Sequence, residues 1–149
     1  MTEIVSERQI ALDPQVVYSA AKRVERFPDV LTSLDAVKLL EDDGAGNTVS
    51  RWEGTIHVGP LVRKVTWTER DYWDDATRCC TFKLINGDMK EYSGEWTFAA
   101  ANGGCAVRLR VDFELGIPML GPLINRMVDQ VMQQTCDELL EALEKLATT

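Results

Sequence analysis

The side chains that could support acid–base or nucleophilic chemistry are few in this chain. It contains one histidine, His57, and four cysteines, Cys79, Cys80, Cys105 and Cys136. A structural zinc site needs closely spaced Cys and His ligands, such as a CxxC pair, and this spacing does not occur. A thiol nucleophile paired with His57 is formally possible, but no local signature supports it. The pattern is typical of reduced, mostly buried thiols.

The other polar motifs also favour a structural interpretation. His57 falls on the outward side of a predicted strand near its end, which indicates a solvated residue rather than a general base. The acidic pairs Asp42-Asp43 and Asp74-Asp75 lie in turn sequences, where aspartate bonds to nearby backbone. The glycine runs "DGAGN" and "ANGGC" lack the strand–loop–helix context of a nucleotide-binding loop. The sequence therefore predicts no metal and no cofactor.

Length and charge narrow the class of protein. The 149 residues, 45% hydrophobic and 27% charged, suit a single domain over 1–149. The net charge of −8 disfavours nucleic acid and anionic membranes as partners. No apolar run reaches the roughly 18 residues of a membrane span, and "MTEIVSERQI" does not resemble a secretory signal. We expect a cytoplasmic protein without stable membrane insertion; the sequence leaves the oligomeric state open.

Hydrophobic periodicity and turn residues predict an α+β domain. A first strand, "EIVSERQIALD", precedes a helix that Asp13 can cap and Pro14 can begin, and Pro28 indicates a separate short helix. Six further strands are expected at 34–43, 48–58, 62–73, 78–85, 90–100 and 105–115. One long helix follows. This order predicts two layers, in which a curved seven-stranded antiparallel sheet wraps around the C-terminal helix.

The last helix is apolar over a wide face. From Leu123 onward, pairs of apolar residues alternate with pairs of polar ones, so one side of the helix needs a concave apolar partner. Leu139, Leu143 and Leu146 are expected to pack tightly in the core. The preceding turns carry residues that suit an adaptable wall, because methionine fills irregular gaps. This predicted helix wall consists of Met127, Val131, Met132 and Thr135.

Strand alternation predicts a facing wall rich in aromatic rings. Its members are Trp52, Trp67, Phe82, Trp96, Phe98 and Phe113. The spacing alone is equally compatible with a filled core. The polar residues Ser50 and Glu69 fall on the same inward face, where unpaired polar groups would be costly in a dry core but useful in a ligand cavity. Arg8 and Glu69 could also pair across the interior, and a bulge could move either residue outward.

The order of several loose motifs resembles that of a known superfamily. These motifs are "SRWEG", "VTWTERDYWDD", "EYSGEWTF" and "FELGIPMLGPLINRMVDQVMQQ". Together they resemble the START-like superfamily, which also holds Bet v 1 and the polyketide cyclase/dehydrase proteins. Within it, the chain is most similar to bacterial proteins such as the coenzyme Q-binding START-like group and the ribosome-association toxin RatA. The resemblance covers nearly the whole chain and implies a helix-grip fold with a deep cavity.

The resemblance implies three alternative functions. The first is a carrier or sensor that binds a lipid, an isoprenoid quinone or an aromatic polyketide without catalysis, with "LGIPMLGPL" at the mouth. The second is an aromatase/cyclase or dehydratase-like enzyme, which would use Ser50 or Arg51 and Glu69 for proton transfer. Because Ser50 and Arg51 are adjacent, only one of them can face the cavity on a regular strand. The third is a RatA-like protein with a ribosomal partner. We expect the first.

Overall fold

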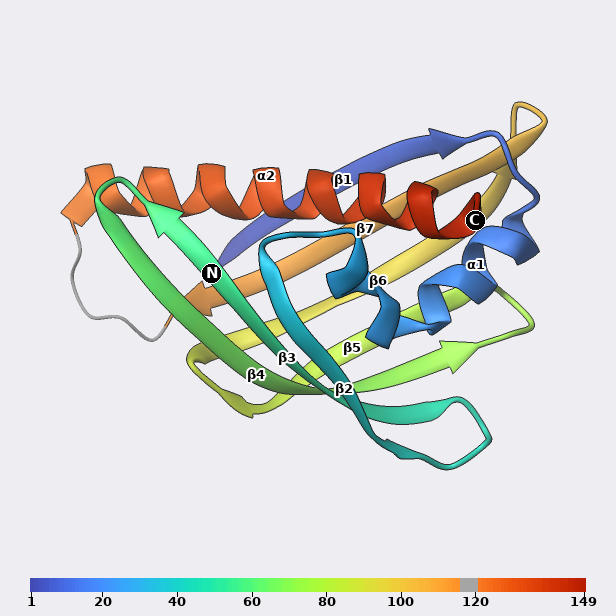
Figure 1. The fold of residues 1–149 in the computed structure, drawn as a ribbon, viewed down its shortest axis with the longest axis horizontal. Helices are drawn as coiled ribbons and strands as arrows, with labels where there is room; N and C mark the ends of the chain where they lie inside the picture. The colour runs from blue at the N-terminus through green and yellow to red at the C-terminus, as the bar shows by residue number, and fades with distance from the viewer. Residues whose placement is uncertain (116–120) are drawn as a thin grey trace.

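A long C-terminal helix lies across one face of a single antiparallel sheet in the computed structural model (Figure 1). The structure describes residues 1–115 and 121–149. The elements follow in the order β1 (Thr2–Ile10), α1 (Pro14–Lys22), the 3-10 helix η1 (Val24–Asp29), β2 (Leu34–Asp42), β3 (Asn47–Val58), β4 (Leu61–Asp74), β5 (Cys79–Gly87), β6 (Met89–Ala101), β7 (Gly104–Leu115) and α2 (Gly121–Ala147).

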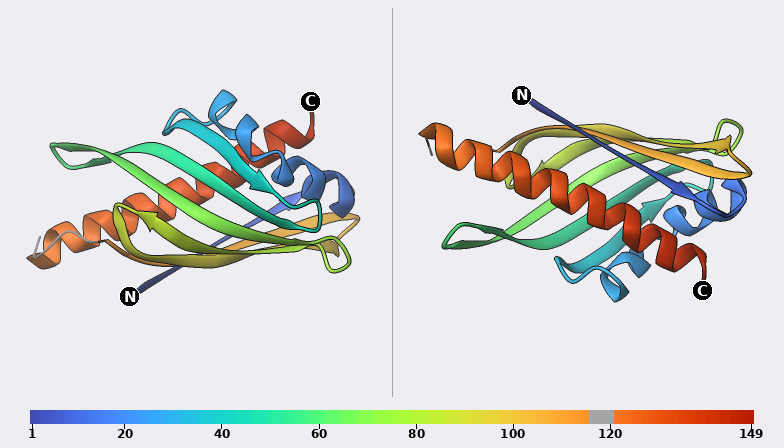
Figure 2. Two further views of the ribbon diagram at one scale, coloured as in Figure 1. Left: turned by 90° about the horizontal axis from the view of Figure 1, so that it is seen from below. Right: turned by 90° about the horizontal axis from the view of Figure 1, so that it is seen from above.

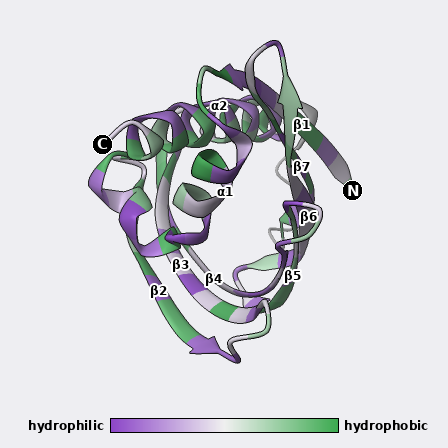
Figure 3. Cartoon of the chain, turned by 90° about the vertical axis from the view of Figure 1, so that its right-hand side faces the viewer, coloured by the Kyte–Doolittle hydropathy of each residue, from purple (hydrophilic) through white to green (hydrophobic). Residues whose placement is uncertain are grey.

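The seven strands form one sheet with the order β1-β7-β6-β5-β4-β3-β2. Every neighbouring pair is antiparallel, and β1 closes onto β7 after the chain has passed through the other strands. The sheet curls around α2, which crosses it diagonally (Figure 2). Viewed end-on, the strands form an open ring, with α1 inside one end of it (Figure 3). The helix-grip fold that the sequence predicts is confirmed.

The two short helices begin and end where the sequence signals lie. The Asp13 carboxylate accepts a hydrogen bond from the Gln15 backbone N–H at 2.8 Å and so caps α1, while Pro14 occupies the first helical position. The segment after α1 forms a separate 3-10 helix that contains Pro28, because proline cannot continue a regular helix. Val17, Tyr18 and Phe27 are buried and fill the end of the curled sheet.

The alternation of the strands matches the predicted inward and outward faces. On β7, Val107, Leu109, Val111 and Phe113 are buried in the core. On β6 the inward face includes Gly94, where the strands approach so closely that a Cβ atom would lie 2.0 Å from the Arg110 carbonyl oxygen. Glycine is therefore required there for steric reasons. The predicted strand limits differ from the observed ones by at most three residues.

The helix α2 is packed more tightly in its second half than in its first. Leu140, Leu143 and Leu146 are buried, whereas in the first half Val128 is buried but Met127 and Val131 are only partly buried against the core. The side chain of Leu123 is 70% exposed. No helix among the described residues is long and apolar enough to cross a membrane. The gradient of packing leaves space between α2 and the middle of the sheet.

Candidate functional site: a cavity between the sheet and α2

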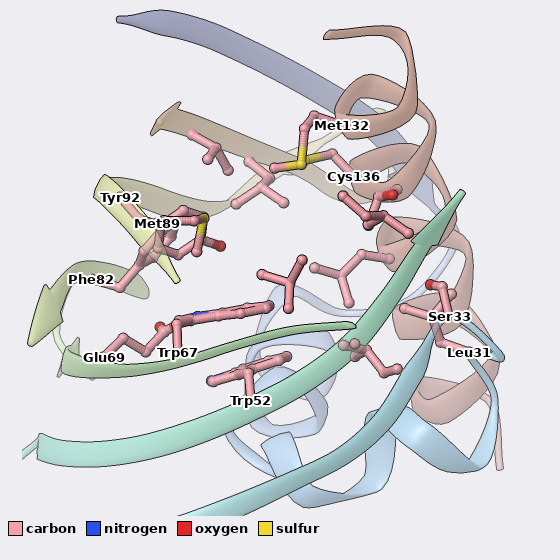
Figure 4. A pocket seen from close by; sticks show the side chains of 18 of the residues that line it. Leu31, Ser33, Trp52, Trp67, Glu69, Phe82, Met89, Tyr92, Met132 and Cys136 are labelled. Atoms are coloured by element: carbon pink, nitrogen blue, oxygen red, sulfur yellow. The ribbon is translucent and has the colours of Figure 1, made fainter. Parts of the chain in front are cut away.

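A cavity of about 100 Å³ lies between the inner face of the sheet and α2. Figure 4 shows aromatic side chains from β3, β4, β5 and β6 on one side, with Met132 and Cys136 of α2 on the other. Leu31 and Ser33, which precede β2, line a third side. The complete lining consists of Leu31, Ser33, Leu34, Trp52, Gly54, Thr55, Ile56, Val65, Trp67, Glu69, Phe82, Met89, Tyr92, Trp96, Leu109, Val111, Leu115, Met132, Thr135, Cys136 and Leu139.

The sheet wall is a continuous series of aromatic contacts. Trp52 and Trp67 are directly opposite each other on β3 and β4, and their rings stack with centroids 5.8 Å apart and an interplanar angle of 8°. Tyr92 continues the series, with centroids 5.5 Å from Trp67 and 5.2 Å from Phe82. Such pairs add stability beyond the burial of area. They also hold the ring faces and edges at fixed positions along the wall.

Both indole N–H groups of this stack are hydrogen-bonded to polar side chains on the same strands. The Trp52 N–H donates to the Ser50 hydroxyl at 2.9 Å, and the Trp67 N–H donates to a Glu69 carboxyl oxygen at 2.8 Å. A buried N–H without a partner would cost about 1–3 kcal/mol. Ser50 and Glu69 therefore satisfy the donors that the aromatic wall introduces, in addition to any role toward a ligand.

Glu69 and Asp71 form a buried carboxyl pair beside the cavity. They are two residues apart on β4 and share its inward face, and their side chains are only 4% and 3% exposed. The Ser50 hydroxyl donates to Asp71 at 2.7 Å, and the Thr48 hydroxyl donates to it at 3.4 Å. Burial raises the pKa of both carboxyl groups, and the nearby charge of Asp71 raises that of Glu69 further.

This arrangement fits one proton shared by the two carboxyl groups. Asp71 accepts from two hydroxyls, which favours its ionised form, whereas Glu69 accepts from one indole. Hydrogen bonding between the two side chains lowers the pKa of Asp71 and raises that of Glu69. The proton is therefore favoured on Glu69 rather than on Asp71. Only Glu69 of the two lines the cavity.

The remaining polar groups of the lining are neutral hydroxyl and thiol groups. The Thr135 hydroxyl donates to the Val131 carbonyl oxygen of its own helix at 2.8 Å. Burial raises the pKa of Cys136 to about 12 and that of Tyr92 well above its usual value, so both stay protonated at neutral pH. The Ser33 hydroxyl is buried without a hydrogen-bond partner among the described residues. A ligand could therefore find a hydroxyl at this end of the cavity.

A family model described as "Polyketide cyclase / dehydrase and lipid transport" matches residues 1–148. The chain belongs to this family. The recognition that the sequence motifs suggested, of a START-like protein in the polyketide cyclase/dehydrase group, is confirmed. No curated protein matches the chain.

Solved structures of similar proteins have the same fold. TTHA0849 from Thermus thermophilus is 33% identical, with a TM-score of 0.90 and coverage of 99% of this chain and 97% of the other. The Zhui aromatase/cyclase from Streptomyces sp. R1128 is 21% identical, with a TM-score of 0.84 and coverage of 99% and 93%. A START superfamily protein from Mycobacterium smegmatis is 14% identical, with a TM-score of 0.77 and coverage of 98% and 97%. At their lower identities, the last two share the fold alone.

In this member of the polyketide cyclase/dehydrase family, seven of the twelve residues predicted to bind a ligand line the cavity. They are Trp52, Trp67, Glu69, Phe82, Trp96, Met132 and Thr135. The strand alternation that placed them inward is correct, and the bulge between Thr68 and Glu69 does not move Glu69 outward. Their contact with a ligand stays a prediction.

The other five predicted residues lie outside the lining, each for a local reason. Ser50 is fully buried behind Trp52, to which its hydroxyl is bonded. Phe98 packs on Tyr18 of α1 with centroids 5.4 Å apart, and Phe113 is buried in the core. Met127 reaches beyond the cavity to Gly59 at the turn between β3 and β4, while Val131 packs against the core.

One polar contact considered possible is not formed, and the choice left open between Ser50 and Arg51 is settled. Arg8 does not pair with Glu69; its guanidinium forms two hydrogen bonds with Glu144 of α2, at 2.7 and 2.9 Å. Arg51 faces outward and forms an ion pair with Glu53, so Arg51 cannot join Glu69 in the cavity. Ser50 is the inward member of that pair. Most of the predicted mouth, "LGIPMLGPL", lies outside the described residues.

Several lining residues were not among the predicted binding residues. Val65, Tyr92, Leu109 and Val111 share the inward faces of their strands, so alternation could have found them. Asp71 lies beside the cavity and shares the inward face of β4 with Glu69, but nothing in the sequence pattern marked it as a partner of Glu69. Leu31 and Ser33 come from the irregular segment before β2, and Leu34 and Met89 are the first residues of β2 and β6, where alternation gives little signal. From α2 come Cys136 and Leu139, and Leu139 lines the cavity although it was expected in the tightly packed core.

Proposed function

We propose that the protein is a noncatalytic carrier or sensor that binds a hydrophobic small molecule in the cavity between the sheet and α2. The observation that carries this proposal is the lining, which is apolar and aromatic apart from a few polar groups that converge on it. Ligand sites in proteins have this composition, with few polar groups that fix orientation. The family description, which includes lipid transport, supports the same class of ligand.

The size of the cavity limits what can enter without movement. An engineered apolar cavity of about 150 Å³ accommodates benzene, and typical ligand pockets have about 300–1,000 Å³. The cavity here has about 100 Å³, so even a single ring requires some expansion and a polyketide or lipid requires more. Met89, Met132 and Leu139 line it. Methionine has three rotatable bonds, and these side chains can change rotamer to admit larger guests.

An enzymatic function of the cyclase or dehydratase type is the second candidate. It is favoured by one observation, the buried carboxyl group of Glu69 on the cavity wall, which could act as a general acid because burial raises its pKa. The remaining polar residues support it less. Ser50 is sealed behind the aromatic wall, and Arg51 faces outward. On the described wall, Tyr92 is the one further group near Glu69 that could transfer a proton. Binding is therefore the function that the geometry supports best.

Native mass spectrometry of the protein purified from its own host tests the proposal. We expect a retained apolar compound that is released on denaturation. A titration with toluene, followed by the NMR signals of the indole N–H groups, tests the cavity directly. Chemical-shift changes confined to Trp52, Trp67 and Trp96 are expected, because these three indoles line the cavity whereas that of Trp73 does not.

Trp96→Leu should change the affinity of the protein for toluene. Phe98→Leu serves as the matched control, in which this affinity should stay the same. Both residues are buried on β6 and their rings stack with centroids 6.0 Å apart, but only Trp96 lines the cavity. Equal effects of the two changes on toluene affinity, or no shift of any indole signal, would contradict the proposed site. Conversion of a polyketide substrate by the purified protein would favour the enzymatic candidate instead.

A further inference from the structure

All titratable side chains that line the cavity are acids. They are Glu69 from β4, Tyr92 from β6 and Cys136 from α2, and none of the described lining residues is a lysine, arginine or histidine. We propose that the Glu69–Asp71 pair is the polar recognition point of the cavity, and that the ligand is an apolar molecule that carries a basic nitrogen. This inference rests on the proposed function and names its class of ligand.

The geometry of Glu69 favours a ligand that donates hydrogen bonds. One of its oxygens accepts from the Trp67 N–H at 2.8 Å, and the neighbouring Asp71 raises the pKa of its carboxyl group. An ionised carboxylate has about four acceptor positions, so once the pair has released its proton, lone pairs of Glu69 remain for a donor in the cavity. A ligand that has only hydrogen-bond acceptors cannot bond to these lone pairs. A carboxylate or phosphate headgroup would place a second negative charge in an enclosed apolar site without a compensating cation.

The aromatic wall adds a second attraction for a cation. The stacked rings of Trp52 and Trp67 and the tilted ring of Tyr92 lie on the same wall as Glu69 (Figure 4). A cation within about 6 Å of an aromatic ring face is attracted by the ring quadrupole, most strongly by that of tryptophan. Carboxylate and aromatic faces therefore act together on an ammonium group, while the apolar lining accommodates the rest of the molecule.

Binding of an ammonium ion should release one proton from the Glu69–Asp71 pair. The empty pair holds one proton. A ligand that is an ammonium ion in water enters with its charge, and the pair releases its proton to the buffer, so the site keeps one positive charge opposite two carboxylates. Binding should therefore tighten as pH rises toward the pKa of the pair, because less work is needed to remove the proton.

No other titratable group facing the pair can take this role. Apart from Asp71, the acidic groups near Glu69 are Cys80 on β5 and Tyr92 on β6, and Cys136 of α2 lies beside Tyr92. Burial raises the pKa of each of them, and they stay neutral over the working range. On β3 the facing side chains are Ser50 and Trp52, which do not titrate.

Four single-ring probes test the proposal, since they differ only in the attached group: benzylamine, benzyl alcohol, toluene and benzoate. We expect benzylamine to bind about tenfold more tightly than benzyl alcohol, because a charged hydrogen bond is stronger than a neutral one by about 1–1.5 kcal/mol. Benzoate should bind least. Calorimetry of benzylamine binding in two buffers of different ionisation enthalpy should show the release of about one proton.

Glu69→Gln keeps the shape of the side chain and removes its acidity. In this variant the preference for benzylamine over benzyl alcohol should fall to near unity and proton release should disappear. Glu91→Gln, on the exposed side of β6, is the matched control and should bind as the unmodified protein does. Proton release in the unmodified protein is measured without any substitution, so a poorly folding variant would not prevent the test.

Three results would overturn the inference. These are benzoate binding as tightly as benzylamine, benzylamine binding without proton release, and an unchanged preference in Glu69→Gln. If toluene binds while any of these holds, the cavity accepts ligands and only the proposed class is wrong. If toluene also fails to bind, the proposed function fails and the inference is overturned with it.

Discussion

The buried carboxyl pair makes a contribution to stability that is lost as pH rises above about 4.5. The pKa of Glu69 is raised well above its ordinary value of 4.5, mainly by burial and then by the charge of Asp71. The folded state therefore keeps a proton that the unfolded state releases. This contribution to stability is fully present below the unfolded-state pKa and is lost as pH rises through the folded-state pKa. Glu69→Gln removes it.

The size of the effect follows from one shared proton. Between the unfolded-state and folded-state pKa values, each pH unit costs the native protein about 1.4 kcal/mol of unfolding free energy relative to the variant. In Glu69→Gln the side-chain amide can donate to Asp71, which also accepts from the Ser50 and Thr48 hydroxyls. These donors offset only part of the burial that raises the pKa of Asp71 in both proteins, so the difference between the two proteins reports mainly the proton of Glu69.

Urea unfolding of both proteins at half-unit steps from pH 4 to 8 measures this difference. The free-energy difference between variant and native protein should rise in favour of the variant from about pH 4.5. Because the other ionisable groups are common to both proteins, their contributions cancel. A difference that stays constant with pH would refute the shared buried proton. Glu91→Gln, at an exposed position, should show that constant difference.

Three further predictions follow from single contacts. Gly94→Ala should destabilise the fold by about 4 kcal/mol or more, because its Cβ would lie 2.0 Å from the Arg110 carbonyl oxygen. In the same urea assay Gly103→Ala, in open space at φ +75°, should cost only about 1 kcal/mol, and similar losses at both sites would contradict this account. Ser50→Ala should cost about 1–3 kcal/mol in chemical denaturation, since it leaves the Trp52 indole N–H without its partner and removes one of the two hydroxyl donors to the Asp71 carboxylate. The Cys136 thiol, with a pKa raised to about 12, should react with a disulfide reagent at pH 8 only as the protein opens; fast labelling of the folded protein, detected by mass spectrometry, would show that this side chain is accessible.

The sequence predicted the arrangement of elements because their signals are local and strong. Asp13-Pro14 begins a helix in any context that allows one, and the alternation of β7 specifies one buried face. The wide apolar stripe of the last helix requires a concave partner, which only a curled sheet can supply here. These features need no knowledge of distant contacts.

The polar contacts of the site could not be predicted in the same way, because they depend on pairing between distant residues. Arg8 and Glu69 both face inward by alternation, but Arg8 lies beside α2 and bonds to Glu144 there. Asp71 carries no distinguishing motif and becomes part of the site only through Ser50 on the neighbouring strand. Alternation predicts which face of a strand a side chain is on, but not which side chain of another element it contacts.

The division between lining and core residues depends on the crossing angle of α2, which periodicity does not give. Phe98 and Trp96 share a face of β6, but α1 covers the first and leaves the second beside the cavity. Similarly, Met127 and Met132 both suit an adaptable wall, but only Met132 reaches the space. The residues predicted to face inward therefore include those that line the cavity, but alternation does not separate them from the core residues packed around the cavity.

The small volume of the cavity has a kinetic consequence. A guest larger than the available space must wait until the surrounding methionine and leucine side chains rearrange, and diffusion then no longer limits association. The observed binding rate should level off at high ligand concentration, at a value common to guests of similar bulk. Such a protein would retain its cargo for long periods, because departure requires the same rearrangement.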